Sequence, residues 1–190
     1  MTDWRPFWDS VHSEGKGYWL TDTPGVEALT QLESLELCSP PPRTVMEIGI
    51  GRHYLTGYLD KAGHKITAVD ISERAFRGLP DRIARVRTPD MVTLPDLSHD
   101  IGLSFLMFQH ADDEMAGFIL KQAVRTCSKF RFQFGSPVAG VPFVNNTGGP
   151  LYLRTPAEMA GLCPDAKLRL MSGPVLKIPD IAWCFMEASL

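Results

Sequence analysis

From Thr44 onward, segments with the apolar pattern of buried strands alternate with segments that have helical spacing. The strand-like segments are 44–50, 65–71, 84–90, 100–108 and 129–136, and the helix-like segments are 52–63, 72–83, 112–128 and 155–163. Strands and helices that take turns in this way form right-handed crossovers, which build a parallel sheet covered on both faces. The last two runs, 166–178 and 181–190, can pair antiparallel at the sheet edge. The alternation therefore predicts an α/β fold, a doubly wound and mostly parallel sheet of about seven strands with an antiparallel edge strand.

The chain has 190 residues, of which 44% are hydrophobic, so it suffices for one well-buried domain and is too short for two. Residues 1–25 are rich in Trp, Tyr, Gly and charged side chains, a composition that predicts an N-terminal arm or lid. The remaining residues, 26–190, are predicted to form the single domain. Apolar residues at three- and four-residue spacing predict an amphipathic helix over 24–37.

Charge and cysteine usage narrow the classes of partner. The formal net charge is -3 and the pI is about 5.9, so the chain has no basic excess to neutralise a nucleic-acid backbone. Four scattered cysteines without close pairing indicate reduced thiols in the cytoplasm. The longest apolar run is far below membrane-spanning length, and the N-terminus has no leader signature. We therefore expect a cytoplasmic protein with neither a nucleic-acid nor a membrane partner, acting as a monomer or homodimer.

A bare glycine turn follows the first strand of the predicted sheet. Gly49 and Gly51 let the backbone approach a ligand closely, and Asp70 ends the second strand, where a carboxylate can bind two ribose hydroxyls. The dinucleotide pattern G-x-G-x-x-G is not completed. Glu47 would also repel a pyrophosphate and attract a cationic amine. The pattern therefore predicts a nucleoside site rather than a dinucleotide site.

With these motifs the sequence resembles the class I S-adenosylmethionine-dependent methyltransferases, over roughly residues 24–190. The segment "EIGIGRH" is similar to the first motif of that family, with His53 in place of its last glycine. The segments "AVDIS", "TPDMVTLP" and "HDIGLSFLMFQHADD" resemble the second, third and fourth motifs. The resemblance implies S-adenosylmethionine as cofactor, S-adenosylhomocysteine as product, and ten cofactor-binding residues: Glu47, Gly49, Gly51, His53, Asp70, Ile71, Asp90, Met91, Ser104 and Phe105.

The resemblance also implies a role for each motif. Asp70 would bind the ribose, and Ile71 would lie against the adenine. Asp90 would accept a hydrogen bond from the adenine amino group, with Met91 beside the ring. The strand end that carries Ser104 and Phe105 would approach the amino-acid part of the cofactor and the methyl group.

Several of these residues also have simpler interpretations. Glu47 can pair with a neighbouring cation, Asp90 can be a turn residue, and Ser72 can cap the helix that follows Asp70. His110 is the candidate catalytic residue, as a general base near the methyl group; alternatively, it packs against and caps the next helix.

Candidate acceptor contacts lie in the N-terminal segment and the loops. They are Tyr18, Trp19, Gln109, Asn145, Tyr152 and Arg154. Three acids, Asp112, Asp113 and Glu114, stand at the start of a predicted helix. They are explained more simply by a favourable interaction with the helix dipole than by metal binding. We expect no metal site.

These observations predict an enzyme that transfers a methyl group to O, N or S of a small-molecule acceptor, without a metal. Three alternatives remain open. The first is an inactive cofactor-binding or regulatory protein, which is suggested by His53 in the glycine motif. The second is a protein or RNA methyltransferase, and the third, more distant, is a nicotinamide-dependent oxidoreductase. The acceptor itself is not disclosed by the sequence.

Overall fold

The computed structural model describes residues 5–14, 43–51, 54–105, 107–138, 150–172, 177–178 and 181–190. In chain order its elements are α1 (Arg5–Glu14), β1 (Thr44–Ile48), α3 (Tyr54–Lys61), β2 (Lys65–Asp70), the 3-10 helix η1 (Glu73–Phe76), β3 (Ala84–Arg87), the 3-10 helix η2 (Thr88–Thr93), β4 (Ile101–Ser104), the 3-10 helix η3 (Phe108–His110), α4 (Asp113–Thr126), β5 (Phe130–Pro137), α5 (Pro156–Gly161), β6 (Lys167–Ser172), β7 (Lys177–Ile178) and β8 (Ile181–Ser189). The predicted helix over 24–37 lies outside the described residues.

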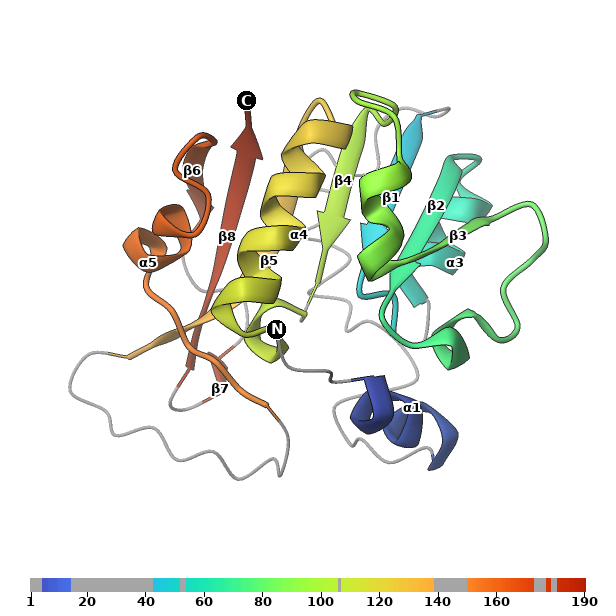
Figure 1. Ribbon diagram of the computed structural model, residues 1–190, viewed down its shortest axis with the longest axis horizontal. Helices are drawn as coiled ribbons and strands as arrows, with labels where there is room; N and C mark the ends of the chain where they lie inside the picture. Colours follow the sequence, from blue (N-terminus) through green and yellow to red (C-terminus); the bar gives the residue numbers. More distant parts are fainter. Residues whose placement is uncertain are drawn as a thin grey trace.

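The strands form one sheet in the order β3-β2-β1-β4-β5-β8-β6, with β7 paired to β8 off this path (Figure 1). The five strands from β3 to β5 are parallel, and β8 runs antiparallel to β5, β6 and β7. This confirms the predicted mostly parallel sheet. The antiparallel part is larger than the single edge strand expected, because β8 is inserted between β5 and β6.

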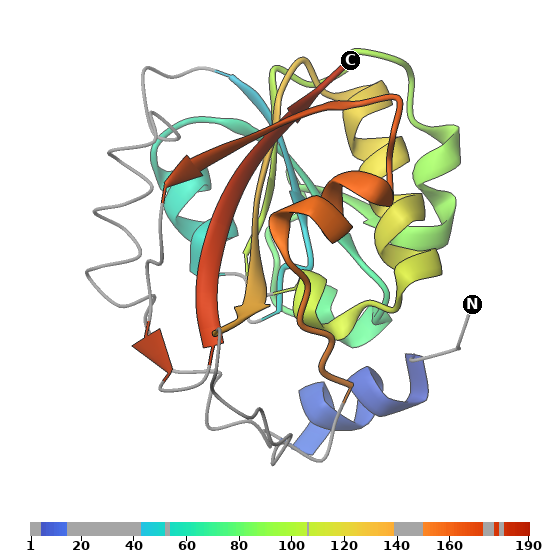
Figure 2. The ribbon, with the colours of Figure 1, turned by 90° about the vertical axis from the view of Figure 1, so that its left-hand side faces the viewer.

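Helices cover both faces of the sheet, and each face has its own apolar cluster. Helix α4 packs on one face of the sheet (Figure 2). Its apolar side chains belong to the same cluster as Phe130, Phe132 and Phe134 of β5. Helix α3 packs on the other face against alternate residues of β1, β2 and β4. Because the two clusters use alternating positions of the same strands, the motif residues at the strand ends are held from both sides.

Two predicted elements differ from the structure. The helix expected over 72–83 is only the short 3-10 helix η1, because Gly78 takes a positive φ of 82° and Pro80 follows it. The strand expected over 100–108 ends at Ser104. The chain then leaves the sheet, and Met107 in helical conformation begins η3. Both differences shorten the elements at the carboxyl ends of β2 and β4, where the cofactor motifs lie.

Helix α1 lies beyond the carboxyl ends of the parallel strands, beside η1 (Figure 1). The Ser72 hydroxyl donates to the Asp9 carboxylate, and the Arg74 guanidinium donates to the Asp9 carbonyl oxygen at 3.3 Å. The N-terminal helix is thus tied to the segment that follows Asp70. None of the helices in the described residues is long and apolar enough to cross a membrane.

Candidate active site

The glycine turn after β1 has the geometry that requires glycine. Gly49 and Gly51 have φ values of +74° and +52°, a region that other residues enter at a cost. The Gly49 N–H donates to the carbonyl oxygen of Val69 at 2.8 Å, which joins the exits of β1 and β2. A Cβ on Gly49 would lie 2.4 Å from Cγ of Met107. Met107 therefore packs directly on the turn, a contact that the sequence did not predict.

Asp70 lies at the end of β2 with its carboxylate turned toward this turn. One oxygen accepts the Ser72 N–H at 2.9 Å and the other accepts the Gly51 N–H at 3.4 Å. Burial raises the pKa of Asp70 to about 6, and these backbone bonds oppose the rise. The carboxyl group is therefore mainly ionised at neutral pH. It retains further lone pairs for a ligand's hydroxyl groups.

Glu47 is buried on the α3 face of β1, 4% exposed, and has one short hydrogen bond. The Thr56 hydroxyl, from α3, donates to Oε2 of Glu47 at 2.6 Å. Burial raises the pKa of Glu47 to about 8, the Thr56 bond opposes this rise, and the charge of Asp70 adds to it. Glu47 is thus mainly protonated at neutral pH until a cation approaches. It does not pair with a lysine or arginine of the described chain.

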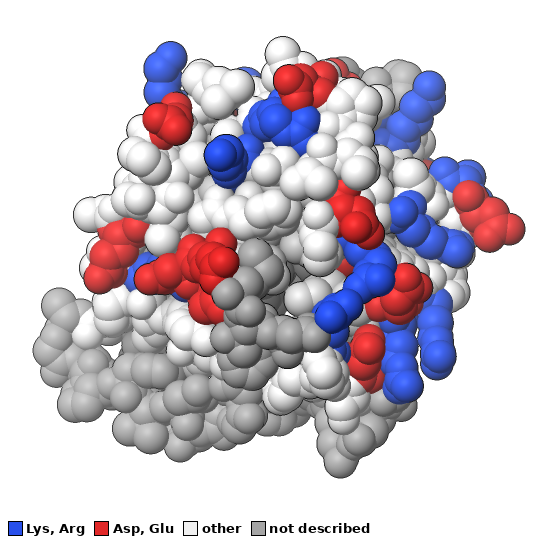
Figure 3. Space-filling model, viewed as in Figure 1, with Lys and Arg blue, Asp and Glu red and all other residues white. Residues whose placement is uncertain are grey.

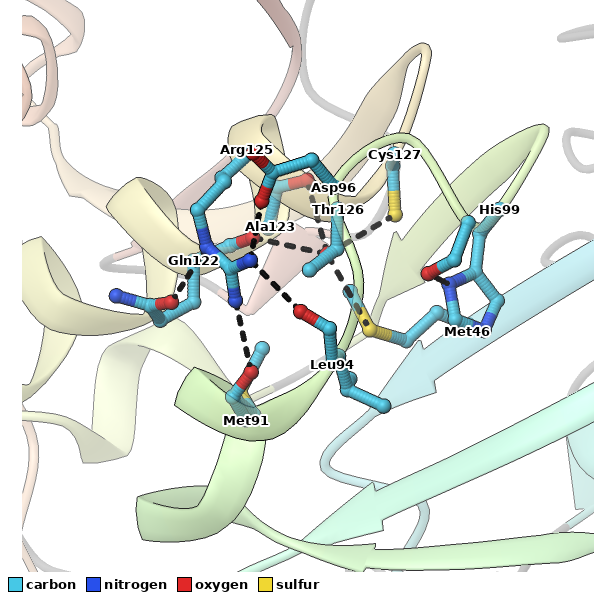
Figure 4. Close-up of polar contacts among 11 residues, drawn as sticks. Met46, Met91, Leu94, Asp96, His99, Gln122, Ala123, Arg125, Thr126 and Cys127 are labelled. Carbon is cyan, nitrogen blue, oxygen red and sulfur yellow. Dashed lines mark hydrogen bonds and ion pairs between the residues drawn. The ribbon is translucent and has the colours of Figure 1, made fainter.

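The third motif is fixed by Arg125 at the end of α4 (Figure 4). Its Nη2 donates to the Met91 carbonyl oxygen at 3.0 Å, and its Nη1 donates to the Leu94 carbonyl oxygen at 2.7 Å. Along η2, the Asp90 side chain is exposed, whereas Met91 is fully buried in the α4-face cluster. Met91 is thus part of the core beneath the motif, and Ile71 packs against the same cluster.

Ser104 and Phe105 mark the end of β4. The Ser104 hydroxyl is fully buried and donates to the carbonyl oxygen of Ile48 at 3.0 Å, which ties the ends of β4 and β1 together. Phe105 is partly buried and packs on the α3-face cluster, with its ring centroid 5.2 Å from that of Phe185. Ser104 therefore has a structural bond in addition to its predicted cofactor contact.

His110 ends η3 with a defined tautomer. Its Nδ1 lies 2.8 Å from the Pro150 carbonyl oxygen, which can only accept, so Nδ1 carries the proton and Nε2 keeps a lone pair. Burial lowers the pKa of His110, so the ring is neutral at pH 7. The ring of Trp8 meets the His110 ring edge-on at 4.9 Å. The cap of α4 is Asp112, whose carboxylate accepts the Met115 N–H, so His110 is not the cap.

Arg154 holds the segment between η3 and α4. Its guanidinium donates to the carbonyl oxygens of Phe108 and Ala111 at 3.0 and 2.6 Å, and to Asp113 at 2.8 Å. The side chain is only 5% exposed. These bonds favour a positioning role for Arg154 over the predicted acceptor contact.

The other two loop candidates lie beside this segment. Gln109 is buried, and its main-chain carbonyl oxygen accepts the main-chain N–H of Tyr152 at 2.7 Å. Tyr152 is half-buried beneath the Arg154 guanidinium, which lies 5.4 Å from the ring centroid. The η3 segment and the chain after residue 150 therefore form one unit around His110.

Residues 46–129, which contain all four motifs, match a family model described as a methyltransferase domain. This match, together with the fold, supports a class I S-adenosylmethionine-dependent methyltransferase. A comparison with curated protein sequences gave no match.

Solved structures similar to this chain share its fold at low sequence identity. One is the 1,6-didemethyltoxoflavin-N1-methyltransferase of Burkholderia thailandensis with bound 1,6-didemethyltoxoflavin and S-adenosylhomocysteine. Its TM-score is 0.71 at 20% identity, over 98% of this chain and 86% of that chain. Another is the magnesium protoporphyrin IX methyltransferase of Synechocystis PCC 6803 with bound S-adenosylhomocysteine. Its TM-score is 0.65 at 15% identity, over 97% of this chain and 96% of that chain.

Four of the predicted site residues lie outside the described residues. They are Tyr18, Trp19, His53 and Asn145. Sequence reasoning also missed two residues at the site, Thr56 and Met107. Thr56 lies nine positions after Glu47, in the first turn of helix α3, so its hydroxyl could have been weighed as a partner. No sequence signal links Met107 to Gly49.

A cavity of about 420 Å³ lies at the opposite edge of the sheet. It is lined by residues at the amino ends of β1, β2 and β3, with His64 and His99 among them. Ligands of open parallel sheets bind at the carboxyl ends, so this cavity is not the candidate active site.

Proposed function

We propose that this methyltransferase transfers the methyl group of S-adenosylmethionine to O, N or S of a small-molecule acceptor, without a metal. The observation that carries the proposal is the ionised Asp70 carboxylate beside a turn that is kept bare at Gly49 and Gly51. A carboxylate with free lone pairs suits two neighbouring ribose hydroxyls, and a bare turn suits close approach of the nucleoside.

The described residues at the strand ends fit this cofactor. Asp70 would hold the ribose. The Asp90 side chain is exposed on η2, so it would be accessible to accept a hydrogen bond from the adenine amino group. Glu47 would meet the amino group of the methionine part. The raised pKa of Glu47 means that a nearby ammonium group would displace its proton and create the ion pair. The donor set therefore matches a ligand with a diol at one end and a cation at the other.

When bound, the cofactor supplies a methyl group on a sulfonium sulfur, a good leaving group for in-line displacement. Transfer would break the S–CH3 bond and form an acceptor–CH3 bond, and the acceptor would lose a proton. The chain's own work is to align the two molecules and exclude water. Nε2 of His110, which has a lone pair because Nδ1 carries the proton, would take that proton. Helix α1, which contacts both Ser72 and His110, would cover the two molecules.

A small-molecule acceptor is supported by the solved relatives and by the surface. The relative from Burkholderia thailandensis is bound to 1,6-didemethyltoxoflavin, a small molecule. On the face that Figure 3 shows, basic and acidic side chains of the described residues are interspersed. The arginines toward β3 are paired, Arg82 with Asp60 and Arg87 with Glu73. Such a surface does not favour the phosphate backbone of RNA.

The cytoplasm is the compartment that we propose. Three described cysteines, Cys127, Cys163 and Cys184, are free thiols, and burial raises the pKa of each. Buried protonated thiols persist in a reducing compartment. A monomer or homodimer remains our prediction for the assembly state.

The test is a labelling experiment with methyl-labelled S-adenosylmethionine and three acceptor pools: a small-molecule library, total RNA and a protein extract. We expect label in the small-molecule pool, and the same yield with EDTA present. Label confined to RNA or protein, or a yield abolished by EDTA and restored by a divalent cation, would contradict the proposal.

The role of His110 has its own test. His110→Gln should leave cofactor affinity within about twofold and lower the turnover number by on the order of 100-fold, because it removes a general base. Recording turnover against pH distinguishes this from a loss of packing. A base gives a profile that falls at acid pH in the natural protein and is flat in the variant, whereas an unchanged profile assigns His110 to structure alone.

A further inference from the structure

Buried polar atoms without partners gather at one place in the described chain. Arg131 and Gln133 of β5 and Trp183 of β8 are 7%, 0% and 4% exposed. Nη1 of Arg131, Nε2 and Oε1 of Gln133, and Nε1 of Trp183 have no hydrogen-bond partner among the described residues. Native proteins pair nearly all such groups, so a cluster of unpaired ones calls for a ligand or water.

These side chains share one face of the sheet. In the β5–β8 register, Arg131 faces Glu187, Gln133 faces Phe185, and Gly135 faces Trp183. The phenylalanines between them on β5 belong to the α4-face cluster, so Arg131, Gln133 and Trp183 point to the other face. We call Arg131, Gln133, Trp183 and Phe185 the β5–β8 patch.

The β5–β8 patch lies at the level where the cofactor motifs end. Ile48 at the end of β1 pairs with Ser104, and Ser104 pairs with Phe132, so Gln133 is level with Phe105 and Gly49. Strands are about 4.8 Å apart, so Gln133 lies about 10 Å across the sheet from the glycine turn.

The chemistry of the patch defines what it can bind. Gln133 offers two N–H donors and one carbonyl acceptor, and Trp183 and Arg131 add donors. The rings of Phe105 and Phe185 pack against each other with their centroids 5.2 Å apart, and they form an apolar wall beside these groups. The charge of Arg131 is already matched by Glu187, whose Oε2 accepts from Nε at 2.8 Å. A flat, uncharged ring with a C=O next to an N–H therefore satisfies more of these groups than any ion.

We propose that the β5–β8 patch is the acceptor subsite, and that the acceptor is an uncharged planar heterocycle with a lactam-type C=O and N–H edge. Gln133 pairs with this edge through both ends of its amide, and Trp183 donates to the ring's carbonyl oxygen. The inference rests on the proposed function, because the patch is an acceptor site only if the cofactor lies on the turn beside it.

The test uses the full-length 15N-labelled protein saturated with S-adenosylhomocysteine and the probe 2-pyridone, a flat lactam. Nuclear magnetic resonance follows the Gln133 side-chain NH2 and the Trp183 indole N–H, assigned with Gln133→Leu and Trp183→Phe. We expect saturable shifts of both signals. N-methyl-2-pyridone, which has lost the donor, should bind at least tenfold more weakly, and benzene should shift neither signal.

Matched variants separate recognition from packing. Gln133→Leu should weaken 2-pyridone binding at least tenfold, whereas Gln122→Leu, at a buried glutamine of α4 on the other face, should leave it unchanged. Gln133→Met is the second variant if the leucine variant does not fold.

Three results would overturn the inference while leaving the proposed function intact: binding of S-adenosylhomocysteine without saturable shifts from 2-pyridone, equal binding of benzene, or unchanged binding in Gln133→Leu. The first of these would assign the patch to bound water only. Failure of S-adenosylhomocysteine to bind would instead remove the proposed function.

Discussion

The carboxyl edge of the sheet has two halves that differ in how their polar groups are satisfied. On the β1–β2 half, Asp70 and Glu47 each have a hydrogen-bond partner within the protein. On the β5–β8 half, Gln133 and Trp183 are equally buried and have none among the described residues. Both halves are rigid strand ends of the same sheet, so the contrast does not arise from a loop.

The contrast suggests a division of labour. Groups that are already bonded hold their geometry before a ligand arrives, which suits a cofactor common to a whole family. Unpaired groups impose a cost that only a matching ligand removes, which suits recognition of one acceptor. The β1–β2 half is therefore preorganised, and the β5–β8 half is selective.

The largest effect concerns the proton on Glu47. Its folded pKa of about 8 exceeds the ordinary value of 4.5, so between these pH values the folded protein binds more protons than the unfolded chain. The free energy of unfolding therefore falls as pH rises through this window, by an upper limit of about 5 kcal/mol. Urea unfolding at pH 5, 7 and 9 measures this. Glu47→Gln, which keeps a neutral hydrogen-bonding group, should be flatter with pH and more stable than the natural protein at pH 9; parallel profiles would mean that Glu47 is not protonated in the fold.

Next in size is the effect of a methyl group on the glycine turn. Gly49→Ala places a Cβ 2.4 Å from Met107 at a positive φ, so we expect about 3 kcal/mol of lost stability from strain and overpacking. Cofactor binding should also fall below detection. Gly57→Ala is the control, since a Cβ there meets nothing within 4 Å in helix α3. Normal titration of S-adenosylhomocysteine by Gly49→Ala would show that the turn is not the cofactor cradle.

A substitution of Arg154 tests whether the loop around His110 is held independently of the β1–β2 half. Arg154→Met leaves the carbonyl oxygens of Phe108 and Ala111 without their donor, so we expect about 2 kcal/mol of lost stability. Turnover should fall while cofactor affinity stays within about threefold. Thermal unfolding and calorimetry on the same variant measure both quantities. An equal loss of cofactor affinity and turnover would show that the two halves are coupled through this loop.

The smallest effect is expected at the link between α1 and η1. Asp9→Ala removes the acceptor of the Ser72 hydroxyl, and its loss should cost about 1 kcal/mol or less in stability. If α1 covers the bound cofactor, the dissociation rate of S-adenosylhomocysteine should rise several-fold in this variant. A stopped-flow displacement experiment measures that rate. An unchanged rate would identify α1 as a structural helix rather than a cover.

The sequence predicted the parts of this molecule that depend on local pattern. The strand–helix alternation gave the parallel sheet, and the positive φ of Gly49 follows from a glycine at a strand exit. It did not predict that 72–83 would contain only a 3-10 turn, because helical spacing outweighed the signals of Gly78 and Pro80.

The remaining misses concern contacts between distant residues. The contacts of Met107 with Gly49 and of Trp8 with His110 join segments far apart in the chain, so no spacing reveals them. Gln133 sits in a strand otherwise rich in phenylalanine, where its polar side chain was overlooked. Its significance depends on the register with β8, which sequence pattern alone does not give.

The central claim is that the β1–β2 half of the carboxyl edge binds the cofactor through Asp70. Isothermal titration of S-adenosylhomocysteine into the natural protein and into Asp70→Ala tests this most directly. We predict micromolar-range binding to the natural protein and affinity weaker by about 2 kcal/mol in the variant, because charge-assisted bonds to the ribose are lost. Equal affinities, or no binding to the natural protein, would contradict the claim.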